Sequence, residues 1–292
     1  MDWDWDDVRY FLAVSRRGSH KSAARQLGVD PTTISRRLAS LENTLGAKLF
    51  VRTPESLEPT PAGLTLKAHA ERVEAEMLAA ERALEANDTR VEGTLSVTAP
   101  DGFIYYVLVP VIAELRRLHP ALTLELRGET RVLDLTRREA DVAFRFGKPT
   151  EASLVVRKLG TVEYGLYAAD RYLEARGNPR SLASLATHDW IGFDASLDDV
   201  SQVRWVRRIV KEPRYVVRTN STTSQVLACA DGQGVALFPA YVAAREPGLR
   251  RLLPRLLGPS RDLYFVTHED LRTNARVVAF QSFVAGVVAA GT

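Results

Sequence analysis

Residues 19–45, SHKSAARQLGVDPTTISRRLASLENTL, carry the pattern from which the fold of the first part of this chain can be predicted. Gly28 can adopt a positive φ and end one helix. Asp30 caps a second helix, and Pro31 occupies its first position, where a missing N–H costs nothing. Apolar residues then recur at spacings of four, three and four, which leaves one helix face apolar: Ile34, Leu38, Leu41 and Leu45. The stretch therefore predicts two short helices joined by a tight turn.

The other face of the second helix carries hydroxyl and guanidinium groups, on Thr32, Thr33, Ser35, Arg36 and Arg37. In a helix-turn-helix, the N-terminal half of the second helix enters the major groove of DNA. Arginine forks match guanine edges and phosphates there, and short hydroxyls reach bases or the backbone. We therefore predict that this face binds double-stranded DNA. The alternative is an ordinary helical hairpin with a solvated basic face.

Charge is distributed unevenly along the chain. The 292 residues, 46% of them hydrophobic, include 39 Lys+Arg and 36 Asp+Glu, so the formal net charge is only +3. From Arg9 to Arg52, however, nine basic residues stand against two acidic ones. Such a cluster can meet phosphates and release counterions. Lys21, near the start of the first short helix, and Arg52 are predicted to anchor phosphates.

Three motifs in this region resemble, in order and spacing, the DNA-binding domain of LysR-type transcriptional regulators. They are VRYFLAVSRRGSHKSAARQLGV at 8–29, TTISRRLASLENTLGAKLFVRT at 32–53 and TPAG at 60–63. The resemblance implies a winged helix-turn-helix, a linker helix that pairs with its counterpart in a second subunit, and a C-terminal effector domain similar to periplasmic solute-binding proteins. It also implies dimers or dimers of dimers.

The sequence departs from this family at two places. Residues 48–53 and 57–60 are predicted to form the strands of the wing, but its tip, PESLEP, carries Glu55 and Glu58 where family wings often carry basic residues. Acid near phosphate is repulsive, so Ser56 and Thr60 are only weak candidates for DNA contact. His20 stands where typical family members carry an aromatic residue.

Helices are predicted on both sides of this motif, over residues 5–17 and 61–87. In the longer one, apolar residues alternate at spacings of four and three, as in a coiled-coil seam: Leu66, Ala70, Val73, Met77, Ala80 and Leu84. We predict that this helix dimerises, which would pair two recognition helices on a two-fold symmetric site. The alternative is a helix packed on its own chain.

The polar segment NDTRVE, residues 87–92, marks a domain junction. Beyond it, strands and helices alternate, which predicts a mostly parallel sheet with right-handed crossovers. Strands are expected at 93–98, 122–126, 141–146, 162–168, 190–193, 215–218, 234–238 and 263–267. Helices are expected at 107–118, 132–139, 170–176, 181–185, 221–230 and 275–289. The motifs PDGF, DVAFRFG and GQGVALFP resemble the LysR effector domain more loosely.

We therefore expect an α+β multidomain protein. Its parts are a winged helix-turn-helix at 1–60, a linker and dimerisation helix at 61–91, and a two-lobed α/β effector domain at 92–292. The chain is expected to pass between lobes near Gly160 and Leu263, so that one lobe holds 92–160 and 264–292 and the other 161–263.

A small-molecule effector is expected between the lobes, where strand ends and helix N-termini meet. The candidates are Pro100, Asp101, Gly102, Phe103, Thr130, Arg145, Phe146, Thr219, Asn220 and Ser221. Arg145 can hold a carboxylate bidentately, or else form an interlobe or intersubunit ion pair. The residues from Thr219 to Ser221 either bind the ligand or only cap a helix. Asp101 would repel a carboxylate unless Arg145 or a ligand amine neutralises it.

No sequence pattern of an enzyme is present: there is no GxSxG elbow, HExxH pair or Walker loop. Gly232 and Gly234 precede a strand and lack the third glycine of a dinucleotide fingerprint, so no cofactor is predicted. The five histidines have no metal-ligand spacing, and the single cysteine, Cys229, is expected to be a small buried hydrophobe. MDWDWDD does not resemble a signal peptide and no apolar run approaches a membrane span, so a cytoplasmic location without membrane contact is expected.

The leading hypothesis is a non-enzymatic, effector-controlled, sequence-specific transcriptional regulator. Three rivals are weighed against it. A solute receptor without DNA would need a signal peptide and no basic helix-turn-helix. An enzyme on the α/β part would show turnover rather than stoichiometric ligand binding. A nucleoid-type DNA binder would have no ligand. The operator, the effector and the sign of regulation cannot be read from the sequence.

Overall fold

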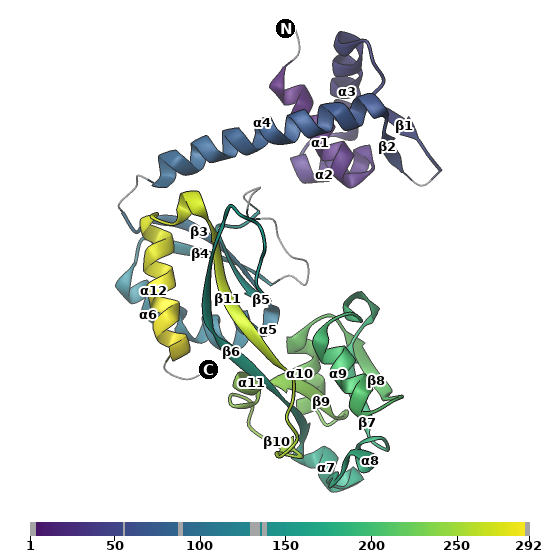
Figure 1. Cartoon of the computed structure of the whole chain (residues 1–292), viewed down its shortest axis with the longest axis vertical. Helices are drawn as coiled ribbons and strands as arrows, with labels where there is room; N and C mark the ends of the chain where they lie inside the picture. Colours follow the sequence, from purple (N-terminus) through teal and green to yellow (C-terminus); the bar gives the residue numbers. More distant parts are fainter. Residues whose placement is uncertain (1–3, 55, 87–89, 129–134, 136–138, 290–292) are drawn as a thin grey trace. The chain divides into compact units, whose positions relative to one another are not determined.

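The computed structural model describes residues 4–54, 56–86, 90–128, 135 and 139–289. Contacts along the chain divide it into two compact units, Met1–Glu81 and Arg82–Thr292, which are described separately. The long helix α4 (Pro61–Ala86) begins in the first unit and ends in the second (Figure 1). None of the described helices is both long and apolar enough to cross a membrane.

The first unit is a three-helix cluster followed by a two-stranded wing. Its elements are α1 (Trp5–Arg17), α2 (His20–Leu27), α3 (Pro31–Leu45), β1 (Phe50–Arg52) and β2 (Leu57–Pro59). Asp30 caps α3 as expected, accepting a hydrogen bond from the Thr32 N–H at 2.8 Å. Gly28 ends α2 with a φ of 66°, a conformation that side chains with a Cβ rarely adopt. The predicted helix-turn-helix is therefore confirmed.

The core of this unit is built from the apolar faces of its helices. Ile34 and Leu41 of α3 are fully buried against Phe11 and Leu12 of α1 and the small side chains of α2. Because the inward face of α3 is apolar, its polar face is left outward. Burial of each large side chain contributes about 1.5–3 kcal/mol.

The TPAG motif docks the start of α4 onto the wing. The Thr60 hydroxyl donates to the Lys48 carbonyl at 2.7 Å and accepts from the Gly63 N–H at 3.0 Å. A Cβ on Gly63 would overlap the Leu49 carbonyl oxygen. Only glycine allows the first turn of α4 to approach the chain this closely.

Helix α4 divides its apolar residues between two environments. Ala70 is buried and Leu66 is partly buried in the core of the first unit. Val73 and Met77, by contrast, are 47% and 49% exposed. Packing on the chain itself, one of the two readings of the heptad pattern, therefore accounts for the beginning of the seam but not for Val73 and Met77.

The second unit is built on a seven-stranded sheet, in the order β10-β6-β11-β5-β3-β4 with β9 also paired to β6. A separate two-stranded sheet holds β7 and β8. The strands are β3 (Gly93–Ala99), β4 (Leu122–Gly128), β5 (Val142–Phe146), β6 (Leu154–Ala169), β7 (Asp189–Phe193), β8 (Arg214–Thr219), β9 (Ala236–Pro239), β10 (Leu249–Leu252) and β11 (Ser260–His268).

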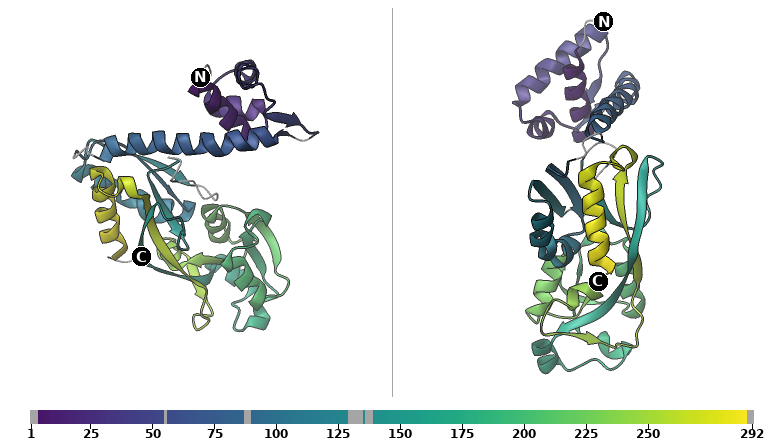
Figure 2. Two further views of the ribbon diagram at one scale, coloured as in Figure 1. Left: turned by 45° about the horizontal axis from the view of Figure 1, so that its top comes forward. Right: turned by 90° about the vertical axis from the view of Figure 1, so that its left-hand side faces the viewer.

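Two long strands join the halves of this unit. The first part of β6, up to Glu163, pairs with β11. From Tyr164 onward the same strand pairs with β9 and β10, so β6 takes part in both halves of the sheet. Strands β6 and β11 run side by side (Figure 2). Pairs β3–β4, β3–β5 and β7–β8 are parallel, but every pair made by β6 or β11 is antiparallel. The expectation of a mostly parallel sheet is therefore wrong. It was based on consecutive strand–helix–strand units, and it did not include the antiparallel pairs that β6 and β11 make with strands distant in the sequence.

Helices pack around these strands. They are α5 (Asp101–Phe103), α6 (Ile112–Leu118), α7 (Asp170–Arg176), α8 (Leu182–Leu185), α9 (Ser201–Ile209), α10 (Thr222–Ala230), α11 (Ala240–Ala243) and α12 (Ala275–Ala289). The core includes Phe103, Trp190, Phe238, Phe265 and Phe280, all nearly inaccessible to solvent. Cys229 is fully buried as expected, and burial raises the pKa of its thiol to about 12.

The helices differ from the sequence expectation in three places, one of which is the short α11, where no helix was expected. Between the strand expected at 93–98 and the helix expected at 107–118, the chain is already helical from Asp101, and helical structure with changing pitch continues to Leu118. Pro100 ends β3 without breaking this helix because it precedes the first turn, where no N–H is needed. Helix α9 was not predicted, although Val203 and Val206 provide its buried face. The helix expected at 132–139 falls largely outside the described residues.

Candidate functional site

The first candidate surface is the outward face of α3. Thr32, Ser35 and Arg36 are exposed there, and Thr33 is half-buried. Within the described part of the chain, Arg36 forms no hydrogen bond or ion pair, so its guanidinium is available to a partner. The Thr32 hydroxyl donates to Asp30 at 2.6 Å, and hydrogen bonds from Thr32 lower the pKa of the Asp30 carboxyl. This cap orders the end of the helix that would meet DNA.

Arg37 differs from its neighbour Arg36 because its side chain has partners within the unit. Its Nη1 lies 3.2 Å from the carboxylate of Asp7, whose side chain is only 8% exposed. The guanidinium also lies 5.8 Å from the centre of the Tyr10 ring. The structure thus places Arg37 at the junction of α3 and α1, where it holds the recognition helix on the core.

His20 links α2 to the recognition helix. Its Nδ1 lies 2.9 Å from the Ser35 hydroxyl. Burial, and then the positive charge of Arg52, lower the pKa of His20 below the ordinary value of 6.5. His20 and Arg52 also line a small cavity of about 280 Å³ beside the turn between α1 and α2. The neighbourhood of Ser35 is therefore basic but holds a neutral imidazole at pH 7.

Two further predicted phosphate contacts, Lys21 and Arg52, are exposed. Among the described residues neither forms an ion pair. The wing that carries Arg52 is anchored by a 2.7 Å hydrogen bond from the Leu57 N–H to the Gly18 carbonyl. Ser56 is occupied within the wing turn, where its N–H donates to the Thr53 hydroxyl at 3.0 Å. Glu58 is exposed, and Glu55 lies outside the described residues.

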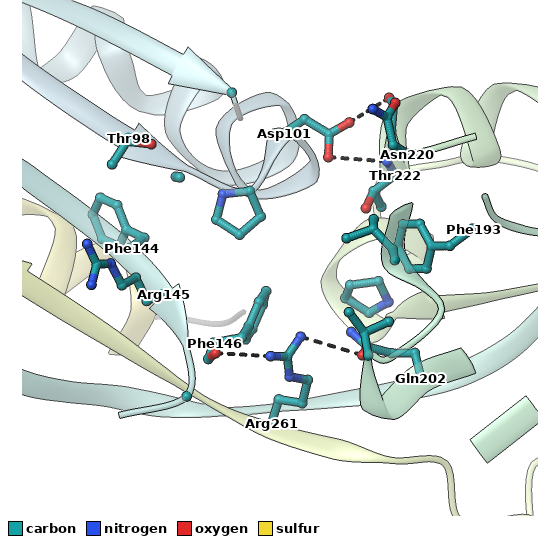
Figure 3. Close-up of a pocket in the computed structure, with 18 of the residues that line it drawn as sticks. Thr98, Asp101, Phe144, Arg145, Phe146, Phe193, Gln202, Asn220, Thr222 and Arg261 are labelled. Atoms are coloured by element: carbon teal, nitrogen blue, oxygen red, sulfur yellow. Dashed lines mark hydrogen bonds between the residues drawn. The ribbon is translucent and has the colours of Figure 1, made fainter. Parts of the chain in front are cut away.

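The second candidate site is a cavity of about 840 Å³ in the second unit. It is bounded by the ends of β3 and β5, the middle of β6, the segment from β7 to α9, the start of α10, and parts of β9 and β11 (Figure 3). Six of the predicted residues line it: Pro100, Asp101, Arg145, Phe146, Asn220 and Ser221. The strand ends and the helix N-terminus that the sequence placed together therefore do surround one cavity.

Of the other four predicted residues, the three that the structure describes do not line this cavity. Phe103 is fully buried in the core, and Gly102 is buried against Thr222. The Thr219 hydroxyl accepts from the Ser221 N–H at 3.2 Å, so it orders the turn before α10. Thr130 lies outside the described residues.

Asp101 is held at the N-terminus of α10. Its carboxylate accepts hydrogen bonds from the Ser221 hydroxyl at 2.6 Å, the Thr222 N–H at 3.2 Å and the Thr223 N–H at 3.0 Å. The sequence had suggested Arg145 or a ligand amine as its neutralising group. Arg145 instead lies 3.9 Å from Glu151, with its side chain 13% exposed.

Several lining residues were not predicted from the sequence. Arg261, on β11, donates to the Phe146 carbonyl at 3.0 Å and lies 4.9 Å from the centre of the Phe146 ring. Gln202 of α9 donates to the Tyr164 hydroxyl at 3.1 Å, and burial raises the pKa of that phenol. Phe193 adds an aromatic wall. These residues come from distant parts of the chain, and their local sequence has no binding motif that could have identified them.

The cavity combines aromatic walls with a few polar groups at its edges. This is the usual composition of a small-molecule site. The described residues contain no group of three or more His, Cys, Asp or Glu side chains placed to hold a metal ion.

Comparison with known proteins gives consistent matches over both units. Residues 5–64 match the family model described as "Bacterial regulatory helix-turn-helix protein, lysR family", and residues 88–289 match the "LysR substrate binding domain". An HTH-type transcriptional regulator of Xanthomonas campestris pv. campestris is 29% identical over 298 residues, covering 97% of this chain and 85% of that protein.

Solved structures extend this similarity to the fold. CrgA of Neisseria meningitidis, named an HTH-type transcriptional regulator, is 27% identical with 97% of each chain covered. A structure of CrgA superimposes with a TM-score of 0.61, covering 97% of this chain and 98% of that one. A structure of full-length CbnR complexed with its target DNA, 22% identical, has a TM-score of 0.59 and covers 97% of this chain and 99% of that chain, a likeness of fold alone. The relatives named here are transcriptional regulators and not enzymes.

Proposed function

This chain belongs to the LysR family of bacterial transcriptional regulators, and we propose that it reads a specific operator through α3 and is controlled by a small molecule bound in the 840 Å³ cavity. The observation that carries the first part is the state of Arg36: it is exposed on the N-terminal half of a capped recognition helix and has no partner within the described chain. A free guanidinium in this position can form a bidentate contact with guanine.

We assign the other contacts by their geometry. Thr32, Thr33 and Ser35 would contact bases or backbone from the same helix, and Lys21 and Arg52 would contact phosphates on either side. Arg37 would act chiefly by holding α3 in place, since its charge already faces Asp7. The wing carries Glu58 in the open, so its tip would contribute little to phosphate binding.

Two subunits are part of the proposal. Residues 61–91 would pair with the same segment of a second chain through the exposed Val73 and Met77, and two recognition helices would then read a two-fold symmetric operator. Residues 1–60 would form the DNA-binding domain and residues 92–292 the effector domain, the latter with lobes at 92–160 and 264–292, and at 161–263. Effector binding would favour one arrangement of the dimer only if the effector binds the two arrangements with different affinity.

Footprinting on the DNA that flanks the protein's own coding region tests the operator claim. A protected, roughly two-fold symmetric site that survives competitor DNA is expected. Arg36→Ala should weaken binding to that site by about 1–3 kcal/mol and relax specificity at one base position in each half-site. Arg9→Ala is the matched control, because it removes an equal charge from an exposed arginine on α1 that pairs with Asp6. Equal effects of the two substitutions would contradict base recognition by Arg36.

Effector control is tested by filling the cavity. Leu197 lines it and is half-buried, so Leu197→Trp would occupy space needed by a ligand. The variant should protect the operator as the wild type does, but expression of a reporter from the adjoining promoter should no longer change between growth substrates that alter it in the wild type. A reporter response identical to that of the wild type would argue against this cavity as the effector site.

A further inference from the structure

The N-terminus of α10 has the properties of an anion site, and a carboxylate of the chain already fills it. The first N–H groups of a helix have no partner inside the helix, and its N-terminus carries a partial positive charge. Here two of these N–H groups and the Ser221 hydroxyl all donate to the Asp101 carboxylate, at 3.0, 3.2 and 2.6 Å. These are the donors that an anionic ligand in the cavity would otherwise use.

The backbone around Asp101 keeps the carboxylate in this position. Asp101 begins α5, and the next residue, Gly102, lies so close to α10 that an added Cβ would be 3.0 Å from the Thr222 Cγ2 atom. On the other side, a Cβ on Gly128 would lie 3.5 Å from the Asp101 Cα atom. The backbone of Asp101 therefore lies between the end of β4 and the start of α10. From this position its carboxylate contacts the first N–H groups of α10.

Another cation of the cavity remains open to a ligand. Arg261 is half-buried, stacks on Phe146 and donates to a carbonyl and to the Gln202 side-chain amide at 3.5 Å. No ion pair joins it to any carboxylate in the described parts of the chain. Figure 3 shows Arg261 and Asp101 at opposite edges of the cavity, with Phe146 and Phe193 among the side chains between them.

Resting on the proposal that this cavity holds the effector, we propose that Asp101 is a built-in anion that determines ligand specificity. It occupies the α10 end and excludes any carboxylate or phosphate group from it. A second anion placed there would lack donors and would face a like charge at close range. The cavity would then bind a ligand with an apolar or aromatic body. The part of this ligand that lies beside the N-terminus of α10 would be uncharged. A single anionic group, if the ligand has one, lies at the Arg261 edge.

Thermal unfolding of the full-length protein in the presence of sulfate tests this proposal without needing the effector. Asp101→Ala frees the three donors. Millimolar sulfate should therefore raise the Tm of this variant by at least about 3 °C more than that of the wild type. A shift of this size is expected when the sulfate concentration is well above the Kd of the site. Asp101→Asn keeps an acceptor in the site and should gain no such response. Sodium chloride at equal ionic strength corrects for general salt effects.

Three controls locate the anion and keep the proposal falsifiable. Asp231→Ala removes a carboxylate that follows the C-terminal end of α10 and pairs with Arg171, so it should respond like the wild type. Adding Ser221→Ala to Asp101→Ala should reduce the sulfate response, and adding Arg261→Gln should leave it unchanged. If Asp101→Ala does not fold, Asp101→Ser, whose side chain is too short to fill the site as a carboxylate or amide does, carries the same prediction.

The proposal is overturned if sulfate affects Asp101→Ala and the wild type equally, or if the extra response disappears with Arg261→Gln. Because the assay contains no DNA, its outcome is independent of operator binding. A protein that fails the footprinting test can still show the sulfate response, and the reverse also holds.

Discussion

Adjacent arginines in α3 have different surroundings, because only Arg37 faces a carboxylate of the same unit. Arg36 points to the side of the helix opposite its buried residues, whereas Arg37 pairs with Asp7 at 3.2 Å and lies beside Tyr10. From sequence alone the two are equivalent basic residues on one face. The difference follows from α1, which brings Asp7 to α3 across 30 residues of chain.

Arg37→Ala is expected to destabilise the first unit by about 1–3 kcal/mol, since it leaves the nearly buried Asp7 carboxylate without this partner. Urea unfolding measures the loss. Adding Asp7→Ala to Arg37→Ala should recover part of it, while Arg36→Ala alone should leave stability unchanged within about 0.5 kcal/mol. Equal stability of Arg36→Ala and Arg37→Ala would contradict a positioning role for Arg37.

His20 should make the stability of the first unit depend on pH. Its pKa is lowered in the folded state, so the unfolded state binds the proton more readily. The stabilisation is complete above the unfolded pKa of about 6.5 and is lost as pH falls through the lower folded pKa. His20→Phe should remove this part of the acid sensitivity, as seen in the difference between urea unfolding curves of the two proteins across that range.

Ser35→Ala serves as the comparison for this prediction. It removes the hydroxyl that lies 2.9 Å from the imidazole but keeps the histidine, so the loss of stability on acidification should persist in it. Identical pH dependence of the wild type and His20→Phe would show that the protonation of His20 is not linked to folding.

At the scale of an element, α4 serves both the DNA-binding unit and the proposed dimer. Its first turns are anchored by Gly63, Leu66 and Ala70 within the first unit. Further along, the apolar seam continues through Val73 and Met77, which are about half exposed. Because these apolar residues are uncovered, we expect a partner helix to pack on them.

The double substitution Val73→Asp and Met77→Asp should therefore weaken dimerisation by a factor of at least about 30, because two apolar side chains of the interface are replaced by repelling charges. Analytical ultracentrifugation over a range of concentrations measures this. Ala75→Asp is the control: Ala75 is exposed on the opposite side of the helix, so this single charge should leave the association unaffected. A dimer that withstands the double substitution would place the interface elsewhere.

At the scale of the whole molecule, each unit has its own buried core. The cluster around Phe11 and Leu41 belongs to the first unit, and the cluster around Trp190, Phe238 and Phe265 to the second. Among the described residues, those that line the cavity all lie between Thr98 and Arg261. The proposed ligand binding and the proposed operator recognition would thus depend on separate cores within one chain.

A fragment comprising residues 90–292 should consequently fold alone and retain the cavity, but it should not protect the operator. Cooperative thermal unfolding and circular dichroism test the first statement, and footprinting tests the second. Asp101→Ala introduced into this fragment should show the same sulfate response as in the full-length protein. A fragment that remains unfolded would mean that the second unit needs the first for its stability.

Local signals in the sequence were sufficient to predict the helix-turn-helix, the long helix and the closing helix α12. The caps, the terminating glycines and the apolar periodicity act between residues a few positions apart, so their effect on the backbone is visible in a short window. The winged helix-turn-helix and the α/β character of the second unit followed from these signals. The family resemblance was correct for the same reason, since its motifs lie in contiguous stretches.

Features that depend on distant contacts could not be obtained in this way. The antiparallel course of β6 and β11 depends on pairing between Leu154 and His268 at its far end. Asp101 meets Thr223 across 122 positions, and Arg261 meets Phe146 across 115. Contacts between residues so far apart produce no pattern within a short stretch of sequence. The partner of such a side chain is determined only when the sheet has brought the two segments together. The neutralisation of Asp101 by a helix N-terminus is therefore a property of the folded chain.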